Sequence, residues 1–185
     1  MQFDEKIFFK NLLTNQSLYG IMITVKERKV TQMTVTTRAI YFDMDGTIAN
    51  LYGVEGWLND LENYNVRPYA EALPLIRMQT LARLLNKLQN NGYIIGVVSW
   101  LSKTGTAEYN ERVTTAKIDW LKKHLKSVTF DEINIVPYGT PKSTVVKCNG
   151  ILFDDEERNR KEWVTVGNNL AFDVDNIIEI LKGLK

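Results

Sequence analysis

Two carboxylates, Asp43 and Asp45, follow a short apolar run and stand directly before Gly46 and Thr47. The apolar run is typical of a buried strand, and ligands in open α/β sheets bind just beyond the carboxyl ends of such strands. Gly46 lets the backbone turn sharply at that point. Two acids this close repel each other unless a cation or a proton intervenes. The pair therefore suggests a metal-assisted site, although Asp and Gly also favour ordinary turns.

Three further apolar runs end near polar side chains that suit the same chemistry. They are residues 93–98 before Ser99, residues 133–137 before a loop with Lys142, and residues 150–153 before Asp154 and Asp155. In a parallel sheet these ends lie at one edge, so four acids, a hydroxyl and a lysine would converge there. Acids with a hard cation, together with a lysine and a hydroxyl donor, make a site for a phosphoryl group. Each feature also has an ordinary alternative: a turn residue for the serine, a surface position for the lysine and helix capping for the second acid pair.

As a set, these motifs resemble those of the haloacid dehalogenase-like (HAD) hydrolase superfamily. The likeness rests on Asp43-Met44-Asp45-Gly46-Thr47, Ser99, Lys142 and Asp154-Asp155. It covers roughly residues 38–183. Within the superfamily, the stretches 117–125 and 142–146, the latter leading into 151–156, look most similar to the 5′(3′)-deoxyribonucleotidase branch.

The resemblance implies a role for each of these residues. Asp43 would be the nucleophile that attacks phosphorus and forms an aspartyl-phosphate, and Asp45 would be the general acid. Mg²⁺ would be held by the Asp43 carboxylate, the main-chain carbonyl of Asp45 and a carboxylate of the 154–155 pair. We expect Asp155 to be the direct ligand, with Asp154 behind it. Phosphate contacts are expected from Thr47, Ser99, Trp100 and Lys142.

The activity implied by the resemblance is that of a Mg²⁺-dependent phosphomonoesterase. The favoured substrate is a small phosphorylated compound, a nucleoside or deoxynucleoside monophosphate, as for a 5′-nucleotidase. A small cap at about 48–74 would supply the leaving-group pocket, where Tyr52 and Trp57 could stack on a base or simply pack the cap. Two alternatives remain open: a phosphatase acting on a sugar phosphate or a larger phosphorylated molecule, and a catalytically retired module that binds a phosphorylated ligand.

Alternation of strands and helices predicts an α/β fold, a Rossmann-like parallel sheet with helices on both faces. The HAD-like domain would span 38–185, and residues 1–37 would be an accessory segment with a helix and a β-hairpin. Other predicted elements are a helix through Leu81 and Leu88 that ends at 90–92, helices over 107–125, 156–163 and 176–184, a strand over 164–166, and an N-cap at Asp173 or Asp175.

Bulk composition excludes several classes of function. The 185 residues are 44% hydrophobic and 24% charged, which fits one soluble globular domain. A formal net charge of +1 does not favour long nucleic acid as a partner. The single cysteine, Cys148, excludes an internal disulfide. No apolar run reaches about 18 residues and the start lacks a signal-peptide pattern, so we expect no membrane association and a cytoplasmic location. Homo-oligomerisation is left open.

Overall fold

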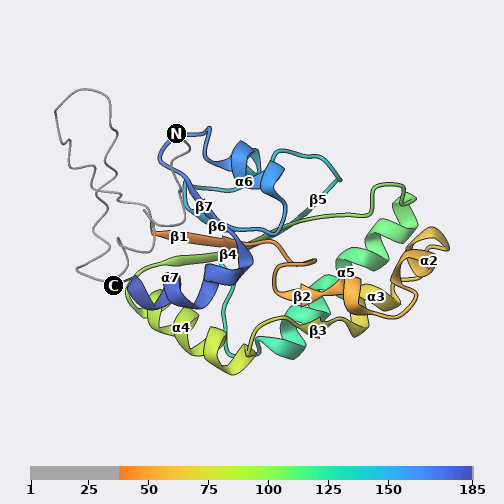
Figure 1. The fold of residues 1–185 in the computed structure, drawn as a ribbon, viewed down its shortest axis with the longest axis horizontal. Helices are drawn as coiled ribbons and strands as arrows, with labels where there is room; N and C mark the ends of the chain where they lie inside the picture. The colour runs from red at the N-terminus through yellow and green to blue at the C-terminus, as the bar shows by residue number, and fades with distance from the viewer. Residues whose placement is uncertain (1–37, 185) are drawn as a thin grey trace, which may run out of the picture.

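The computed structural model describes residues 38–184, so the predicted N-terminal helix and hairpin lie outside the described residues. The core is a five-stranded, all-parallel sheet in the order β5-β4-β1-β6-β7, with the first strand at its centre (Figure 1). Its strands are β1 (Ala39–Phe42), β4 (Ile94–Trp100), β5 (Glu132–Val136), β6 (Ile151–Phe153) and β7 (Leu170–Phe172). The predicted α/β, Rossmann-like fold is confirmed.

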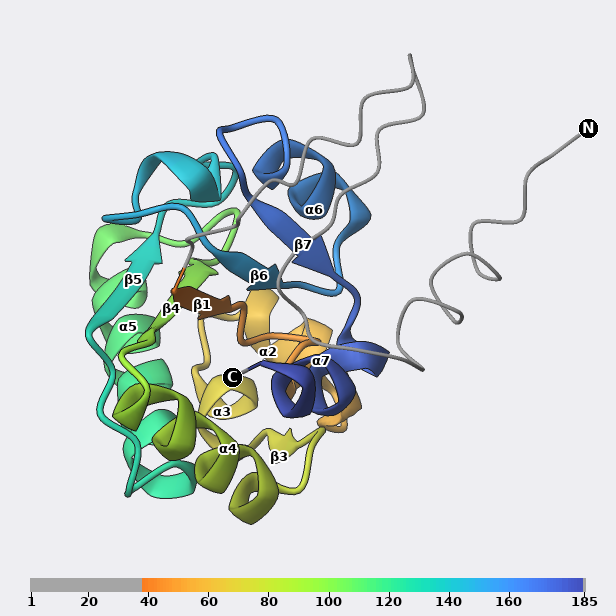
Figure 2. The same ribbon diagram turned by 90° about the vertical axis from the view of Figure 1, so that its left-hand side faces the viewer.

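Successive residues of β1 point to opposite faces of the sheet, and each face is covered by helices. Ile40 and Phe42 belong to the core shared with α4 (Met78–Asn90) and α7 (Ile177–Gly183). Tyr41 points the other way and packs edge-on against Trp163 of α6 (Glu157–Trp163), with ring centroids 5.4 Å apart. Figure 2 shows α4 and α7 on one side of the sheet and α6 on the other. Both faces of β1 are therefore buried, which explains its uninterrupted apolar sequence.

A small insertion, residues 49–74, lies between β1 and α4. Its two ends pair as the short antiparallel strands β2 (Ala49–Asn50) and β3 (Leu73–Pro74). Between them come η1 (Leu51–Gly53), α2 (Trp57–Glu62) and α3 (Arg67–Glu71). These elements pack against the first half of α5 (Ala107–His124), where the Tyr109 hydroxyl donates to the main-chain oxygen of Asn65 at 3.1 Å. The insertion is thus anchored to a core helix (Figure 1).

Most predicted helices have the expected bounds, and the strand predicted over 164–166 is wrong. Val164 and Val166 are exposed in a turn after α6, and the strand that joins the sheet is β7, where Leu170 pairs with Ile151. The β-branched residues at 164–166 suggested a strand, but Gly167, at φ 58°, turns the chain before it reaches the sheet. Asp173 accepts from the N–H of Val174 and caps η3 (Val174–Asn176), which precedes α7. None of the described helices is both long and apolar enough to span a membrane.

Candidate active site

The register of the central strands brings the predicted acids together. Phe42 of β1 pairs with Phe153 of β6, so Asp43 and Asp154 leave the sheet side by side. The N–H of Asp43 continues the ladder by donating to the carbonyl of Phe153 at 2.9 Å. On the other side of β1, Ser99 lies near the end of β4. The carboxyl edge of the sheet therefore gathers the strand-end motifs, as the sequence predicts.

Asp43, Asp154 and Asp155 form a carboxylate triad. One oxygen from each lies within 4.8 Å of the others. Desolvation, and then the charge of Asp43, raises the pKa of Asp154 to about 6 and that of Asp155 to about 7. Oδ1 of Asp43 is buried and makes no hydrogen bond of good geometry, although Nζ of Lys142 lies 3.0 Å away as a charge partner. Crowded carboxylate oxygens with an unsatisfied lone pair are the donor set that a hard divalent cation prefers, so these residues fit Mg²⁺.

Lys142 neutralises part of this charge and is not the surface lysine of the alternative interpretation. Its side chain is 1% exposed, and its Nζ lies 2.6 Å from Oδ2 of Asp154 and 3.0 Å from Oδ1 of Asp43. Burial alone would lower the pKa of Lys142, but the two carboxylates raise it above its ordinary value. Lys142 therefore stays charged beside the predicted nucleophile. It is placed there by η2 (Lys142–Thr144), a turn between β5 and β6.

The two adjacent acids have different surroundings. Both oxygens of Asp154 accept protein hydrogen bonds: Oδ2 from Lys142, and Oδ1 from the N–H of Glu156 at 2.9 Å and from Asn159. Asp154 is fully buried, whereas Asp155 is partly exposed and takes its side-chain hydrogen bond from Thr47 on Oδ1. Asp154 is thus held in place by its neighbours. It accepts from the N–H of Glu156, which is itself the N-cap residue of α6, and no side chain among the described residues caps that helix.

Thr47 was predicted to contact the phosphate, and in the structure it bonds instead to Asp155. Its side chain is fully buried, and its hydroxyl accepts from the N–H of Asp155 at 3.1 Å and lies 3.2 Å from Oδ1 of the same residue. The hydroxyl is committed to orienting Asp155 and is not free for a ligand. Gly46, at φ 76°, makes this approach possible, because a Cβ there would collide with the Asp155 carboxylate and with the Tyr52 ring.

Lys117, on the inward face of α5, was not predicted as a site residue. Its side chain is 1% exposed, and its Nζ lies 2.7 Å from Oδ2 of Asp45, 2.9 Å from Oγ of Ser99 and 2.6 Å from the main-chain oxygen of Trp100. Burial raises the pKa of Asp45 above its ordinary value although Lys117 acts in the opposite direction. The available signal was a lysine at a core position of α5, between the buried residues Val113 and Trp120.

Trp100 forms one wall of the site. Its indole N–H donates to the main-chain oxygen of Thr140 at 2.8 Å, and its ring lies 5.3 Å from Nζ of Lys142. Arg158 and Tyr138 pack on the same ring, at 5.0 Å and 4.8 Å. Trp100 is therefore brought to the site as predicted, with its side chain packed and its main chain tied to Lys117.

The two aromatic rings predicted for the leaving-group pocket are brought together but differ in role. Tyr52 and Trp57 pack edge-on, with centroids 5.1 Å apart. Tyr52 is 50% exposed, and burial together with Asp155, Asp45 and Asp43 raises the pKa of its hydroxyl. Trp57 packs against the apolar cluster that joins the insertion to α5. Tyr52 therefore borders the acids, whereas Trp57 supports the insertion.

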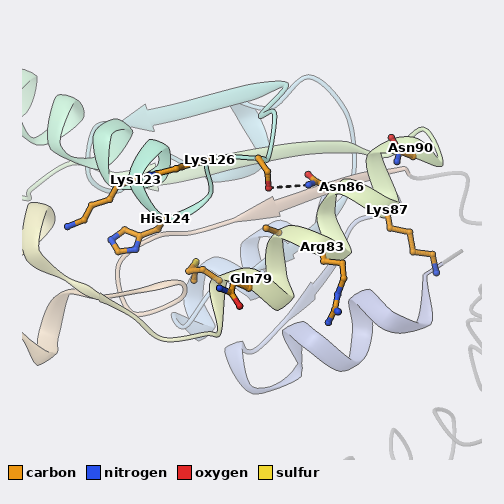
Figure 3. A pocket seen from close by; sticks show the side chains of 11 residues that line it. Gln79, Arg83, Asn86, Lys87, Asn90, Lys123, His124 and Lys126 are labelled. Carbon is orange, nitrogen blue, oxygen red and sulfur yellow. Dashed lines mark hydrogen bonds between the residues drawn. The ribbon is translucent and has the colours of Figure 1, made fainter.

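A separate cavity of about 680 Å³ lies between α4 and the end of α5 (Figure 3). Arg83 and Lys87 line it from α4, and Lys123, His124 and Lys126 from the end of α5 and the loop after it. It is crossed by the hydrogen bond from Asn86 to Ser127, 3.2 Å long. None of the predicted site residues lines this cavity, so the position of the candidate active site follows from its side-chain chemistry.

Comparison with protein-family models gave no match, and neither did comparison with curated proteins. Among solved structures, the chain is similar to a D,D-heptose 1,7-bisphosphate phosphatase from Burkholderia thailandensis, with 13% identity, coverage of 79% of this chain and 97% of that one, and a TM-score of 0.47. It is also similar to the D,D-heptose 1,7-bisphosphate phosphatase from B. bronchiseptica in complex with magnesium and phosphate, with 14% identity, coverage of 79% and 98%, and a TM-score of 0.44. At these values, a function has to be argued from the site itself.

Proposed function

We propose that this protein is a Mg²⁺-dependent phosphomonoesterase of the HAD-like type, acting through an aspartyl-phosphate on Asp43. The observation that carries the proposal is that each acid of the Asp43–Asp45 motif contacts a different buried lysine, and that Asp43 also belongs to a carboxylate triad that fits a divalent cation. Nucleophile, acid, counter-charge and metal ligands thus meet at one sheet edge. A catalytically retired binding module would not need nucleophile and acid together.

Mg²⁺ would be held by the carboxylates of Asp43 and Asp155 and by the main-chain oxygen of Asp45. Asp154, whose oxygens are occupied by Lys142, Glu156 and Asn159, would orient the neighbouring ligand and adjust its charge. When bound, the cation would offset the charge of the triad and of an incoming phosphate dianion.

The protein groups would carry out two successive displacements at phosphorus. An Asp43 oxygen attacks, the ester P–O bond breaks, and Asp45 gives its proton to the departing oxygen. Asp45 then takes a proton from a water that attacks the aspartyl-phosphate, releasing inorganic phosphate and regenerating Asp43. The raised pKa of Asp45 suits the first of these roles, because it favours a protonated carboxyl group.

The phosphoryl oxygens would be bound by Lys142, by the hydroxyl of Ser99 and by main-chain N–H groups near Asp45 and Trp100. Such transfer depends mainly on positioning and on stabilisation of charge. Lys142 lies between Asp43 and Asp154, where it could both position a phosphoryl group and stabilise its charge.

Among substrates, we favour a nucleoside or deoxynucleoside monophosphate. Tyr52 supports this choice because its half-exposed ring borders the acids and could stack on a base. A sugar phosphate, or a phosphate on a larger molecule, is the second candidate, because the insertion contains only two short helices and cannot enclose a ligand widely. Cytoplasmic location and self-association stay predictions.

The proposal is tested by measuring phosphate release from p-nitrophenyl phosphate and from panels of nucleotides and sugar phosphates. Turnover should require Mg²⁺ and stop in excess chelator. Asp119→Asn, which changes an exposed acid on α5, serves as a control and should keep full activity. Equal turnover with and without chelator would contradict the metal requirement, and no turnover on any ester would contradict the function.

A further inference from the structure

Lys117 uses all three of its protons inside the protein. A lysine ammonium has three donors and no acceptor, and the Nζ of Lys117 has three acceptors, on Asp45, Ser99 and the main chain of Trp100. Its stem is buried, and Nζ also lies 5.2 Å from the centre of the Tyr69 ring. Lys117 therefore cannot donate to a phosphoryl oxygen without breaking one of these bonds, so its role differs from that of Lys142.

The bond to Asp45 decides which oxygen of that carboxyl group can carry a proton. Because Lys117 only donates, Oδ2 of Asp45 must accept from it. The carbonyl-type oxygen of a carboxyl group is the better acceptor, so this bond favours Oδ1 as the oxygen that carries an acid proton. The Asp45 side chain is 19% exposed, and among the described residues its carboxyl group has a side-chain hydrogen bond only with Lys117. Lys117 thus limits both the orientation of the carboxyl group and the position of its proton.

The bond to Ser99 has a related effect. Oγ of Ser99 must accept from Lys117, which leaves the hydroxyl proton of Ser99 for another acceptor. The third bond, to the carbonyl of Trp100, ties the lysine to the end of β4. One ammonium group from α5 therefore joins the turn after β1 to the end of β4 and orients a group on each.

We propose that Lys117 is a positioning residue for proton transfer to the leaving group: it holds Asp45 with Oδ1 as the proton-bearing oxygen and Ser99 as a donor to the phosphoryl group. This inference rests on the proposed phosphomonoesterase activity. Lys117 acts through Asp45 and Ser99 and does not touch the substrate. Its contribution is largest where the departing oxygen most needs a proton.

The test is the dependence of kcat/KM on the leaving group in Lys117→Met, which has similar length and no charge. kcat/KM reports the first displacement, in which Asp45 acts as an acid. For an alkyl phosphate, whose leaving group is strongly basic, misplacing the acid should lower kcat/KM about 10²-fold. For p-nitrophenyl phosphate, which leaves readily without protonation, the loss should be at least tenfold smaller. Lys122→Met, on the exposed face of the same helix, is the matched control and should behave as wild type.

A second comparison separates positioning from a general structural effect. In an Asp45→Asn background there is no acid to position, so adding Lys117→Met should produce no further dependence on the leaving group. Circular dichroism and thermal unfolding check that each variant folds, and Lys117→Gln replaces Lys117→Met if the latter does not.

Two outcomes overturn the inference in different ways. Equal losses on alkyl and aryl phosphates, or a leaving-group effect that persists in the Asp45→Asn background, would show that Lys117 only supports the fold. Absence of turnover by the wild-type chain on every ester would overturn the proposed function and, with it, this inference.

Discussion

The two halves of the candidate site are balanced differently in charge. On the side of Asp43, the proposed nucleophile, three carboxylates face one buried ammonium group, that of Lys142. On the side of Asp45, the proposed acid, one carboxyl group faces Lys117, which also bonds to a hydroxyl and a carbonyl. The first side carries excess negative charge and would be balanced by a cation, whereas the single carboxyl group of the second already has an ammonium partner. In the proposed function, a divalent ion would offset charge at the triad as Lys117 does at Asp45.

Among the substitutions that distinguish the two sides, Asp43→Asn should have the largest effect, because it removes the proposed nucleophile. We expect turnover to fall by about 10⁶-fold, the order measured when an enzyme loses its attacking group. The fold should persist, because an amide is nearly isosteric and one repulsive charge is removed from the triad. Steady-state phosphate release and thermal unfolding measure the two effects. An active, folded variant would remove the assignment of Asp43.

Lys142→Met should destabilise the metal-free protein more than Lys117→Met does. It leaves Asp154, fully buried, without its ammonium partner, and loss of one partner of a buried pair costs about 3–5 kcal/mol. Asp45 is partly exposed, so water can replace Lys117 at lower cost. Urea unfolding with and without Mg²⁺ measures both free energies of unfolding. Equal destabilisation by the two substitutions would mean that the two sides do not differ in this way.

Mg²⁺ should stabilise the protein more at pH 8 than at pH 5.5. Burial and Asp43 raise the pKa of Asp155 to about 7 in the metal-free fold, so below that pH a proton must leave before the carboxylate binds a cation. In the metal-free protein the folded state also holds this proton more tightly than the unfolded state, so Asp155's contribution to stability falls as pH rises from about 4 to 7. The first of these effects sets the benefit of Mg²⁺, because stabilisation by a ligand depends on its affinity for the folded state. Each pH unit below 7 should therefore weaken binding up to about tenfold, or 1.4 kcal/mol.

Thermal unfolding with and without Mg²⁺ at the two pH values measures this effect. Asp155→Asn should remove the pH dependence together with most of the binding. A metal-induced rise in Tm that is the same at both values would show that Asp155 does not titrate in this range.

The smallest expected effect concerns the leaving group. Tyr52→Ala should lower kcat/KM for a nucleoside monophosphate by about 5- to 150-fold, the equivalent of 1–3 kcal/mol of base stacking, and leave p-nitrophenyl phosphate nearly unaffected. Trp57→Ala, which removes packing between the insertion and α5, should lower activity on both substrates alike. If Tyr52→Ala lowered kcat/KM equally for both substrates, the hypothesis of a nucleotide substrate would lose its support. A sugar phosphate would then become the better candidate.

Much of the site could be predicted because the strands are parallel and adjacent. Asp43, Ser99 and Asp154 stand at or just beyond strand ends, and the register that pairs Phe42 with Phe153 places two of them side by side. Lys142 was predicted from its place in the loop before β6. Lys117 was missed because it lies in the middle of α5, where lysines usually face solvent. Lys117 joins the site only because the end of β4 packs against the face of α5 on which this lysine lies.

The sequence by itself determined the sheet, its buried central strand and the edge at which the acids gather, because apolar runs and turn residues encode these features locally. Only the tertiary structure decided how the gathered groups share their hydrogen bonds. It committed Thr47 to Asp155, occupied both oxygens of Asp154 and placed Lys117 under Asp45. It also made β7 from residues 170–172 and left the β-branched residues before them exposed. Partners of this kind come from segments up to 108 residues apart, and which donor meets which acceptor is decided by packing.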